Sequence, residues 1–199
     1  MSPVTIIGHS LGGSISLLYT ALYPETVKDL ISIEGMGPPP SMMEDRLNQP
    51  MSDRLDFWIK DLRKLSSRLV KKYETLEEAF QRMQNENPHL SEEQARHLTI
   101  HGSTQNEDGT FSWKFDNYVR TFPPTGIPFD EQWDMFGRIT CPTLLVRGLE
   151  SWASDPTKDG RIDNFNIKVD VATFEDAGHW VHHDQLEPFV ERARAFFVS

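Results

Sequence analysis

The sequence predicts an α/β fold in which parallel strands alternate with helices. Residues 4–7 (VTII) form a short apolar run that ends at Gly8, as expected of a buried strand. Residues 11–22 carry apolar side chains at helical spacing, and residues 27–33 (VKDLISI) are a second strand candidate. Strand, helix and strand at this spacing make a βαβ unit, and the two strands of such a unit are parallel.

The predicted helix at residues 11–22 has one apolar stripe, at positions i, i+4, i+7 and i+11. Its members are Leu11, Ile15, Leu18 and Leu22. A stripe of this kind is the side that an amphipathic helix turns to a core. Pro24 marks the expected end of the helix.

The same frame is predicted again near the end of the chain. Residues 143–147 (TLLVR) and 169–174 (VDVATF) are strand candidates, and residues 184–197 predict a closing helix. Pro188 fits only in the first turn of that helix or just before it, because proline has no backbone N–H to donate.

A long helical block separates the two parts of the frame. Its expected elements are helices at residues 52–72 and 75–86, a third helix that opens with the capping box of Ser91 and Gln94, and a small hairpin or irregular loop at 106–113. We therefore predict three segments: α/β core at 1–36, an inserted block at 37–137, and α/β core at 138–199.

Composition limits the partners that the chain can have. Its 199 residues include 20 Lys and Arg against 30 Asp and Glu, a net charge of −10. Phosphate contacts need clustered Lys and Arg, so this charge argues against a nucleic-acid partner. The basic run at residues 60–72 has helical spacing and is expected to be the solvated face of an amphipathic helix.

Cellular location is also constrained by the sequence. No apolar run approaches the ~20 residues of a membrane helix, and no signal peptide is evident, so we expect a cytoplasmic protein without a membrane span. Cys141 is the only cysteine, which excludes an intramolecular disulfide, and its place before Pro142 favours a buried small residue.

The strongest functional signal is the turn Gly8-His9-Ser10-Leu11-Gly12, a G-x-S-x-G sequence between a predicted strand and a predicted helix. Its glycines allow a sharp turn that would expose the Ser10 hydroxyl at the carboxyl end of the sheet, where ligands of open α/β sheets bind. The Leu11 N–H, in the first helical turn, would be a donor to an oxyanion. We interpret Ser10 as a nucleophile, and a helix-capping serine is the alternative.

A nucleophilic serine needs a base, and the chain has seven histidines. Only His179 lies on a loop (EDAGH) directly after a predicted strand, which would bring it to the same sheet edge as Ser10. His9 is expected to be a structural neighbour. His182 and His183 lack a further Cys or His at metal-ligand spacing, so no metal site is predicted. We predict His179 as the base.

The third member of such a site is a carboxylate that orients the imidazole. It should also follow a strand, and the loop after TLLVRG contains Glu150 and Asp155. We predict Glu150 as the acid. Asp155 is the alternative, with the competing interpretation of a helix cap before Pro156.

Nucleophile, acid and histidine in this order, with a helical block between the first and the last, resemble the α/β-hydrolase fold superfamily. The matching stretches are GHSLGG, YPETVKDLISIEG, ITCPTLLVRG and FEDAGHWVHH, and NPHLSEEQARHL resembles the serine-hydrolase-like branch. The resemblance implies the C-terminal half of an α/β-hydrolase fold, with the block at 37–137 as a cap over the active site. It also implies a serine hydrolase without a cofactor, acting on a small-molecule ester or related carbonyl compound.

The substrate class stays open at this point. Aromatic residues of the block are compatible with an apolar substrate portion or with the core of the cap: Phe111, Trp113, Phe115 and Trp133. In this superfamily, Ser10 argues against epoxide hydrolase and haloalkane dehalogenase chemistry, which use aspartate. C–C bond hydrolysis and hydroxynitrile lyase activity use the same triad and remain alternatives.

The resemblance also implies that the chain is truncated at its N-terminus. Family members have strands before the serine turn and a loop with a second oxyanion donor, and the loss of one such donor typically costs on the order of a hundredfold to a thousandfold in rate. Residues 4–7 would then be an exposed apolar edge through which copies could self-associate. The alternative to an active hydrolase is therefore a non-catalytic fragment.

Overall fold

The computed structural model describes residues 3–67, 70–121, 124–125 and 128–198. The chain forms two compact units, Met1–Arg46 with Ile127–Ser199 and Leu47–Gly126. The inserted unit is thus shorter at both ends than the block predicted at 37–137. Helix α6 (Phe129–Phe136) belongs to the first unit because Phe136 is buried in its core and Trp133 packs against that core.

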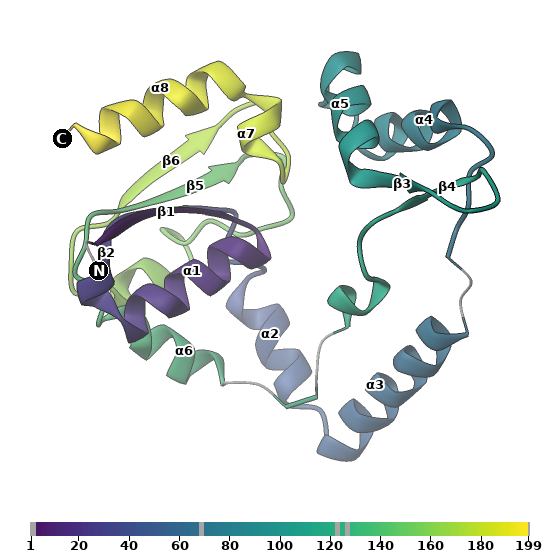
Figure 1. The fold of residues 1–199 in the computed structure, drawn as a ribbon. Helices are drawn as coiled ribbons and strands as arrows, with labels where there is room; N and C mark the ends of the chain where they lie inside the picture. The colour runs from purple at the N-terminus through teal and green to yellow at the C-terminus, as the bar shows by residue number, and fades with distance from the viewer. Residues whose placement is uncertain (1–2, 68–69, 122–123, 126–127, 199) are drawn as a thin grey trace. The chain divides into compact units, whose positions relative to one another are not determined.

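The first unit is built on a parallel sheet of four strands in the order β1-β2-β5-β6 (Figure 1). The strands are β1 (Val4–His9), β2 (Val27–Ile33), β5 (Thr143–Gly148) and β6 (Asp170–Phe174). All four predicted strands are confirmed. The register pairs His9 with Ile33, so the ends of β1 and β2 lie side by side.

Helices cover both faces of this sheet (Figure 1). One face carries α1 (Leu11–Leu22) and α6, and the other carries α7 (Val181–Asp184) and α8 (Leu186–Phe197). The alternation of side chains along β2 supplies both cores, with Leu30 in the α1 cluster and Ile31 in the α8 cluster. Cys141 is buried, as predicted.

Short elements complete the first unit: the 3-10 turns η1 (Pro24–Thr26) and η3 (Arg161–Asn164), and α2 (Pro40–Leu47). None of the helices in the described part of the chain is long and apolar enough to cross a membrane.

The helix α1 buries a different side from the one predicted. Leu11, Ile15 and Leu22 are about half exposed or more, whereas the buried side is formed by small residues and one leucine: Gly13, Ser16, Leu17, Thr20 and Ala21. Small side chains let the helix axis come close to the sheet, and a Cβ on Gly13 would stand 2.8 Å from the Gly35 Cα. Three of the four stripe residues are therefore exposed, and only Leu18 packs against the core.

Strand β1 forms one edge of the sheet. Among the described strands it pairs only with β2, and the exposed fractions of Val4 and Ile7 are 50% and 53%. The predicted apolar edge is therefore present in the structure, and self-association through it stays a prediction.

The second unit consists mainly of helices with one small hairpin. Its helices are α3 (Met51–Ser66), α4 (Leu76–Glu86), α5 (Glu92–Gly102) and the 3-10 turn η2 (Asn117–Arg120). Strands β3 (Ser103–Gln105) and β4 (Phe111–Trp113) pair antiparallel, so the chain forms a hairpin here. The capping box of Ser91 and Gln94 is confirmed.

One predicted helix of this unit is shorter than expected. Helix α3 ends at Ser66, whereas the pattern predicted helix to residue 72. Residues 70–72 are not helical, and Tyr73 instead forms a β-bridge with Phe111 of β4. Residues 68–69 lie outside the described part of the chain. That this unit acts as a cap remains a prediction.

Candidate active site

Ser10 occupies a strained turn between β1 and α1. Its backbone has φ 54° and ψ −118°, a conformation that costs a non-glycine residue free energy and persists only where neighbours impose it. The Ser10 N–H donates to the Ile33 carbonyl at 2.8 Å, and the Ser10 carbonyl accepts from Ser14 N–H at 3.0 Å. A Cβ on Gly8 would stand 2.5 Å from the Gly12 carbonyl oxygen, so the turn requires glycine there.

His179 faces Ser10 from the loop between β6 and α7. Its Nε2 lies 2.8 Å from the Ser10 Oγ. The loop is held by a hydrogen bond of 2.9 Å from Gly178 N–H to the Asp184 carboxylate. The centroid of the Trp152 ring lies 5.0 Å from that of the imidazole, and Trp152 as a whole is 60% exposed. The structure thus brings together the two residues predicted as nucleophile and base.

The carboxylate beside the imidazole belongs to Glu34. Its Oε2 lies 3.3 Å from His179 Nδ1, and its side chain is completely buried. Glu34 directly follows β2 and has φ 55°, so its backbone, like that of Ser10, is held in the left-handed region at the end of a strand. Glu34 N–H donates to the Val146 carbonyl at 2.8 Å.

Two donors from the end of β5 bind the Glu34 carboxylate. Gly148 N–H donates to Oε1 at 2.7 Å, and the Ser151 hydroxyl donates to Oε2 at 2.5 Å. A carboxylate is an acceptor only, so the His179 Nδ1 facing it carries a proton and Nε2 is left to accept from Ser10. This arrangement fixes the tautomer that a general base needs.

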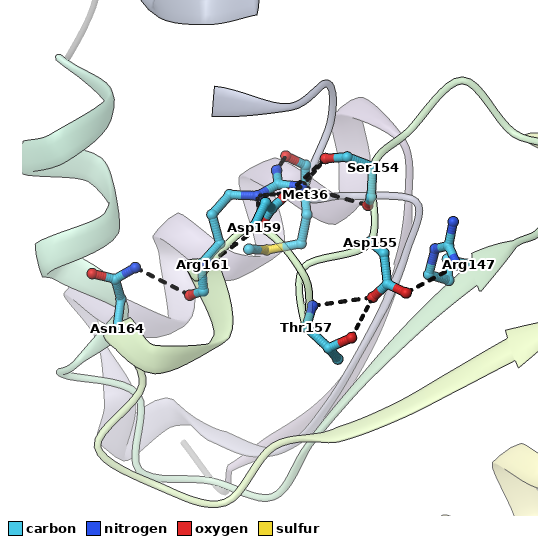
Figure 2. A network of polar contacts seen from close by, with 8 residues as sticks. All are labelled: Met36, Arg147, Ser154, Asp155, Thr157, Asp159, Arg161 and Asn164. Atoms are coloured by element: carbon cyan, nitrogen blue, oxygen red, sulfur yellow. Dashed lines mark hydrogen bonds and ion pairs between the residues drawn. The ribbon is translucent and has the colours of Figure 1, made fainter. Parts of the chain in front are cut away.

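Neither carboxylate expected from the sequence occupies the position next to His179. Glu150 lies in the β5 loop with its N–H bonded to the Ala177 carbonyl at 3.0 Å. Asp155 forms an ion pair of 3.4 Å with Arg147 and accepts from Thr157 (Figure 2). The expectation is corrected in favour of Glu34, because the pairing of β1 with β2 brings residue 34 beside the serine turn.

The pKa of Asp155 reflects this separate ion pair. Burial raises its pKa, but the Thr157 hydrogen bonds and the charges of Arg147 and Lys158 outweigh that effect, so the pKa lies below its ordinary value. Asp155 is therefore a structural carboxylate with partners of its own.

A buried guanidinium ties the two loops around Glu34 together. Arg161 is 2% exposed and donates to the Asp159 carboxylate, to Ser154 and to the Met36 carbonyl (Figure 2). Met36 lies two residues after Glu34, and Ser154 lies three residues after Ser151. Arg161 thus connects the segment after Glu34 with the loop whose Ser151 donates to the Glu34 carboxylate. No local pattern in the sequence distinguishes Arg161.

Three more histidine contacts surround the site. His9 Nε2 donates to the His179 carbonyl at 2.8 Å, which supports the predicted role of His9 as a structural neighbour. Burial lowers the pKa of His9, although that hydrogen bond opposes the shift. The His182 ring packs 4.6 Å from His9 and 4.2 Å from His183, and burial together with these neighbours lowers its pKa to about 4. No group of three or more potential metal ligands is found among the residues that the structure describes.

The geometry permits acyl-transfer chemistry. A hydroxyl, an imidazole and a buried carboxylate in hydrogen-bond sequence can pass the serine proton to nitrogen and stabilise the resulting imidazolium. Leu11 is the first residue of α1, where backbone N–H groups have no partner within the helix and the helix dipole favours negative charge.

Comparison with known proteins agrees with this fold. Residues 2–186 match the family model of the alpha/beta hydrolase fold, and the chain belongs to that family. The thioesterase domain from the curacin biosynthetic pathway superposes with a TM-score of 0.74 at 21% identity, covering 96% of this chain and 66% of that domain. An esterase of Mycobacterium tuberculosis superposes with a TM-score of 0.73 at 20% identity, covering 98% of this chain and 62% of the esterase.

Curated relatives include further hydrolases. A serine hydrolase-like protein of Danio rerio is 26% identical over 166 residues, which are 82% of this chain and 46% of that protein. The sn-1-specific diacylglycerol lipase ABHD11 of Mus musculus is 21% identical over 211 residues, which are 98% of this chain and 59% of the lipase. The chain therefore spans about half the length of these curated relatives.

Proposed function

We propose that the protein is a serine hydrolase of carboxylic esters or related carbonyl compounds. The observation that carries this proposal is the hydrogen-bonded sequence of Ser10, His179 and Glu34, with 2.8 Å between hydroxyl and imidazole and 3.3 Å between imidazole and carboxylate. The esterase, lipase and serine hydrolase names among the relatives support the same class.

The proposed reaction has two halves. Ser10 Oγ attacks the substrate carbonyl while His179 Nε2 takes its proton, and the Glu34 carboxylate stabilises the imidazolium through Nδ1. The Leu11 N–H donates to the oxyanion of the tetrahedral intermediate. His179 then returns the proton to the leaving oxygen, and the C–O bond breaks to leave an acyl group on Ser10. Water, deprotonated by His179, attacks this acyl group and restores the free serine.

The finer substrate class follows from what surrounds the serine. Leu11 and Trp152 flank the site and are 62% and 60% exposed, so apolar surface lies next to the reacting atoms. Transfer of apolar surface out of water is favourable, so a substrate with an apolar portion that covers Leu11 and Trp152 suits this site best. The proposal requires no metal or cofactor to supply the nucleophile.

A fluorophosphonate probe tests the proposal. The probe should label the wild-type chain at Ser10 and leave Ser10→Ala unlabelled, with Ser14→Ala as the matched control. Ser14 lies one turn into α1, and its hydroxyl donates to the Gly35 carbonyl, away from His179. Equal labelling of wild type and Ser10→Ala, or no labelling of a folded wild-type chain, would contradict the proposal and favour the non-catalytic alternative.

A further inference from the structure

We propose that Ser151 is a positioning residue that holds the Glu34 carboxylate in register with His179. The inference rests on the proposed function, since it concerns the same acid. The loop that the sequence predicted to contain the acid would then supply hydrogen-bond donors to an acid from a neighbouring strand.

The shared oxygen is the first observation. Ser151 and His179 both bind Oε2 of Glu34, but the Ser151 contact is 2.5 Å and the His179 contact is 3.3 Å. A distance of ~2.5–2.7 Å is typical of a hydroxyl that donates to a charged oxygen. Of the two contacts that place Oε2, the serine therefore makes the tighter one.

The direction of the Ser151 hydroxyl is fixed as well. Its Oγ accepts the Ala153 N–H at 3.2 Å, so the oxygen has a partner for a lone pair and its own proton is directed to Glu34. A serine hydroxyl rotates to suit its partners, and in the wild type the acceptor that its proton meets is the Glu34 carboxylate. The result is a sequence of donors that runs from Ala153 N–H through Ser151 to the carboxylate.

The contact of Gly148 with the other carboxylate oxygen shows why Ser151 affects the orientation of the carboxylate plane. Within the described part of the chain, Gly148 N–H is the donor to Oε1, and the terminal torsion of a glutamate side chain is broad and weakly restricted. Without Ser151, the contact that the structure shows for Oε2 is the longer one of 3.3 Å with His179 Nδ1, so the plane of the carboxylate would be held less firmly. The backbone of Gly148 is fixed independently, because it is the last residue of β5 and pairs with Phe174 of β6.

A purely structural role for Ser151 makes a different prediction. If the hydroxyl only stabilised the loop through Ala153, its loss would lower stability without changing the tautomer of His179. If it positions Glu34, its loss should let Oε2 move away from Nδ1, and the proton should distribute between the two ring nitrogens. The tautomer of His179 therefore separates the two roles.

The test compares the wild-type chain with Ser151→Ala and with Thr157→Val as the matched control. Thr157 also donates its hydroxyl to a carboxylate of the same loop, at 2.7 Å, but that carboxylate is Asp155 and not Glu34 (Figure 2). Nitrogen NMR of the histidine ring gives the tautomer, the rate of fluorophosphonate labelling gives the reactivity of Ser10, and urea unfolding gives the stability.

We expect Ser151→Ala to convert the single Nδ1–H tautomer of His179 into a mixture. Labelling should slow on the order of tenfold to a hundredfold, as expected for a lost hydrogen bond to a charged group. Ser151→Thr, which keeps the hydroxyl, should restore the rate, and Thr157→Val should leave both readouts at their wild-type values. Should Ser151→Ala unfold, Ser151→Cys replaces it, because a thiol of similar size is a weaker donor.

Two results would overturn the inference: an unchanged His179 tautomer in a folded Ser151→Ala, or an equal loss of labelling in Thr157→Val. The NMR readout does not depend on turnover. A wild-type chain that is not labelled would therefore contradict the proposed hydrolase function. The comparison of His179 tautomers between wild type and Ser151→Ala would still decide the role of Ser151.

Discussion

Replacement of Glu34 by glutamine preserves the shape of the acid but leaves it one acceptor oxygen. If the amide oxygen takes the position of Oε2, its NH2 faces the Gly148 N–H, which donates to Oε1 at 2.7 Å in the wild type. A buried N–H is then unsatisfied, at a cost of about 1–3 kcal/mol. If the oxygen instead accepts from Gly148, the NH2 faces His179, and the Ser151 hydroxyl can turn to accept.

The second orientation satisfies the Gly148 N–H and gives the NH2 group two acceptors, provided that the imidazole moves its proton from Nδ1 to Nε2. We expect it to prevail because it avoids the unsatisfied N–H. His179 would then present an N–H to the Ser10 hydroxyl and could not accept its proton. A tautomer change of this kind in a serine triad costs about 10⁴ in kcat, so we expect Glu34→Gln to lower the rate by roughly 10³–10⁴. This corresponds to about 4–5.5 kcal/mol of barrier.

The assay is the rate of fluorophosphonate labelling at Ser10, with circular dichroism to show that each variant is folded. Glu150→Gln and Asp155→Asn are the matched controls, because their carboxylates are in the loop that the sequence favoured. Both should label close to the wild-type rate. Labelling of Glu34→Gln at the wild-type rate, or an equally large loss in Glu150→Gln, would refute the assignment of the acid.

Two further predictions concern stability. Gly8→Ala should lower the free energy of unfolding by about 1–3 kcal/mol or more, because its Cβ would stand 2.5 Å from the Gly12 carbonyl oxygen. Gly12→Ala is the control, because its Cβ would meet nothing within 4 Å. Equal urea midpoints of the two variants would contradict this prediction. Stability should also fall as pH decreases from 6.5 to about 4, because unfolded His182 binds a proton that the folded state rejects. His182→Asn should flatten this fall in urea titrations, and an unchanged slope would count against it.

The serine turn could be predicted from sequence because its determinants are adjacent in the chain. A buried strand, a glycine, the serine and an amphipathic helix follow one another between residues 4 and 22, and the structure has them in that order. His179 could be found by the same reasoning, since it follows a strand directly.

The position of Glu34 beside His179 depends on strand order and register, which are not local properties of the sequence. Glu34 follows β2 as Glu150 follows β5, so both are carboxylates at the carboxyl end of a strand. What selects Glu34 is the pairing of His9 with Ile33, which sets residue 34 beside Ser10.

The orientation of α1 was beyond the sequence pattern for another reason. Both sides of this helix carry residues that can be buried, and the side with more apolar area, that of Leu11 and Ile15, is the exposed one. Close approach to the sheet favoured the side with Gly13 and Ala21. Apolar periodicity ranks the sides of a helix by hydrophobicity, but it carries no information on how closely the helix backbone must approach the sheet.

The position of β1 at the sheet edge has a consequence for the order in which the site would come apart. The Ser10 N–H is bonded to the Ile33 carbonyl, and the Glu34 N–H is bonded to the Val146 carbonyl at the same distance of 2.8 Å. Glu34 thus follows a strand with neighbours on both sides, while Ser10 follows a strand with a single described neighbour. Fraying from that edge would release the serine first, so deuterium should enter the amides of β1 before those of β2, with the histidine and its acid still assembled.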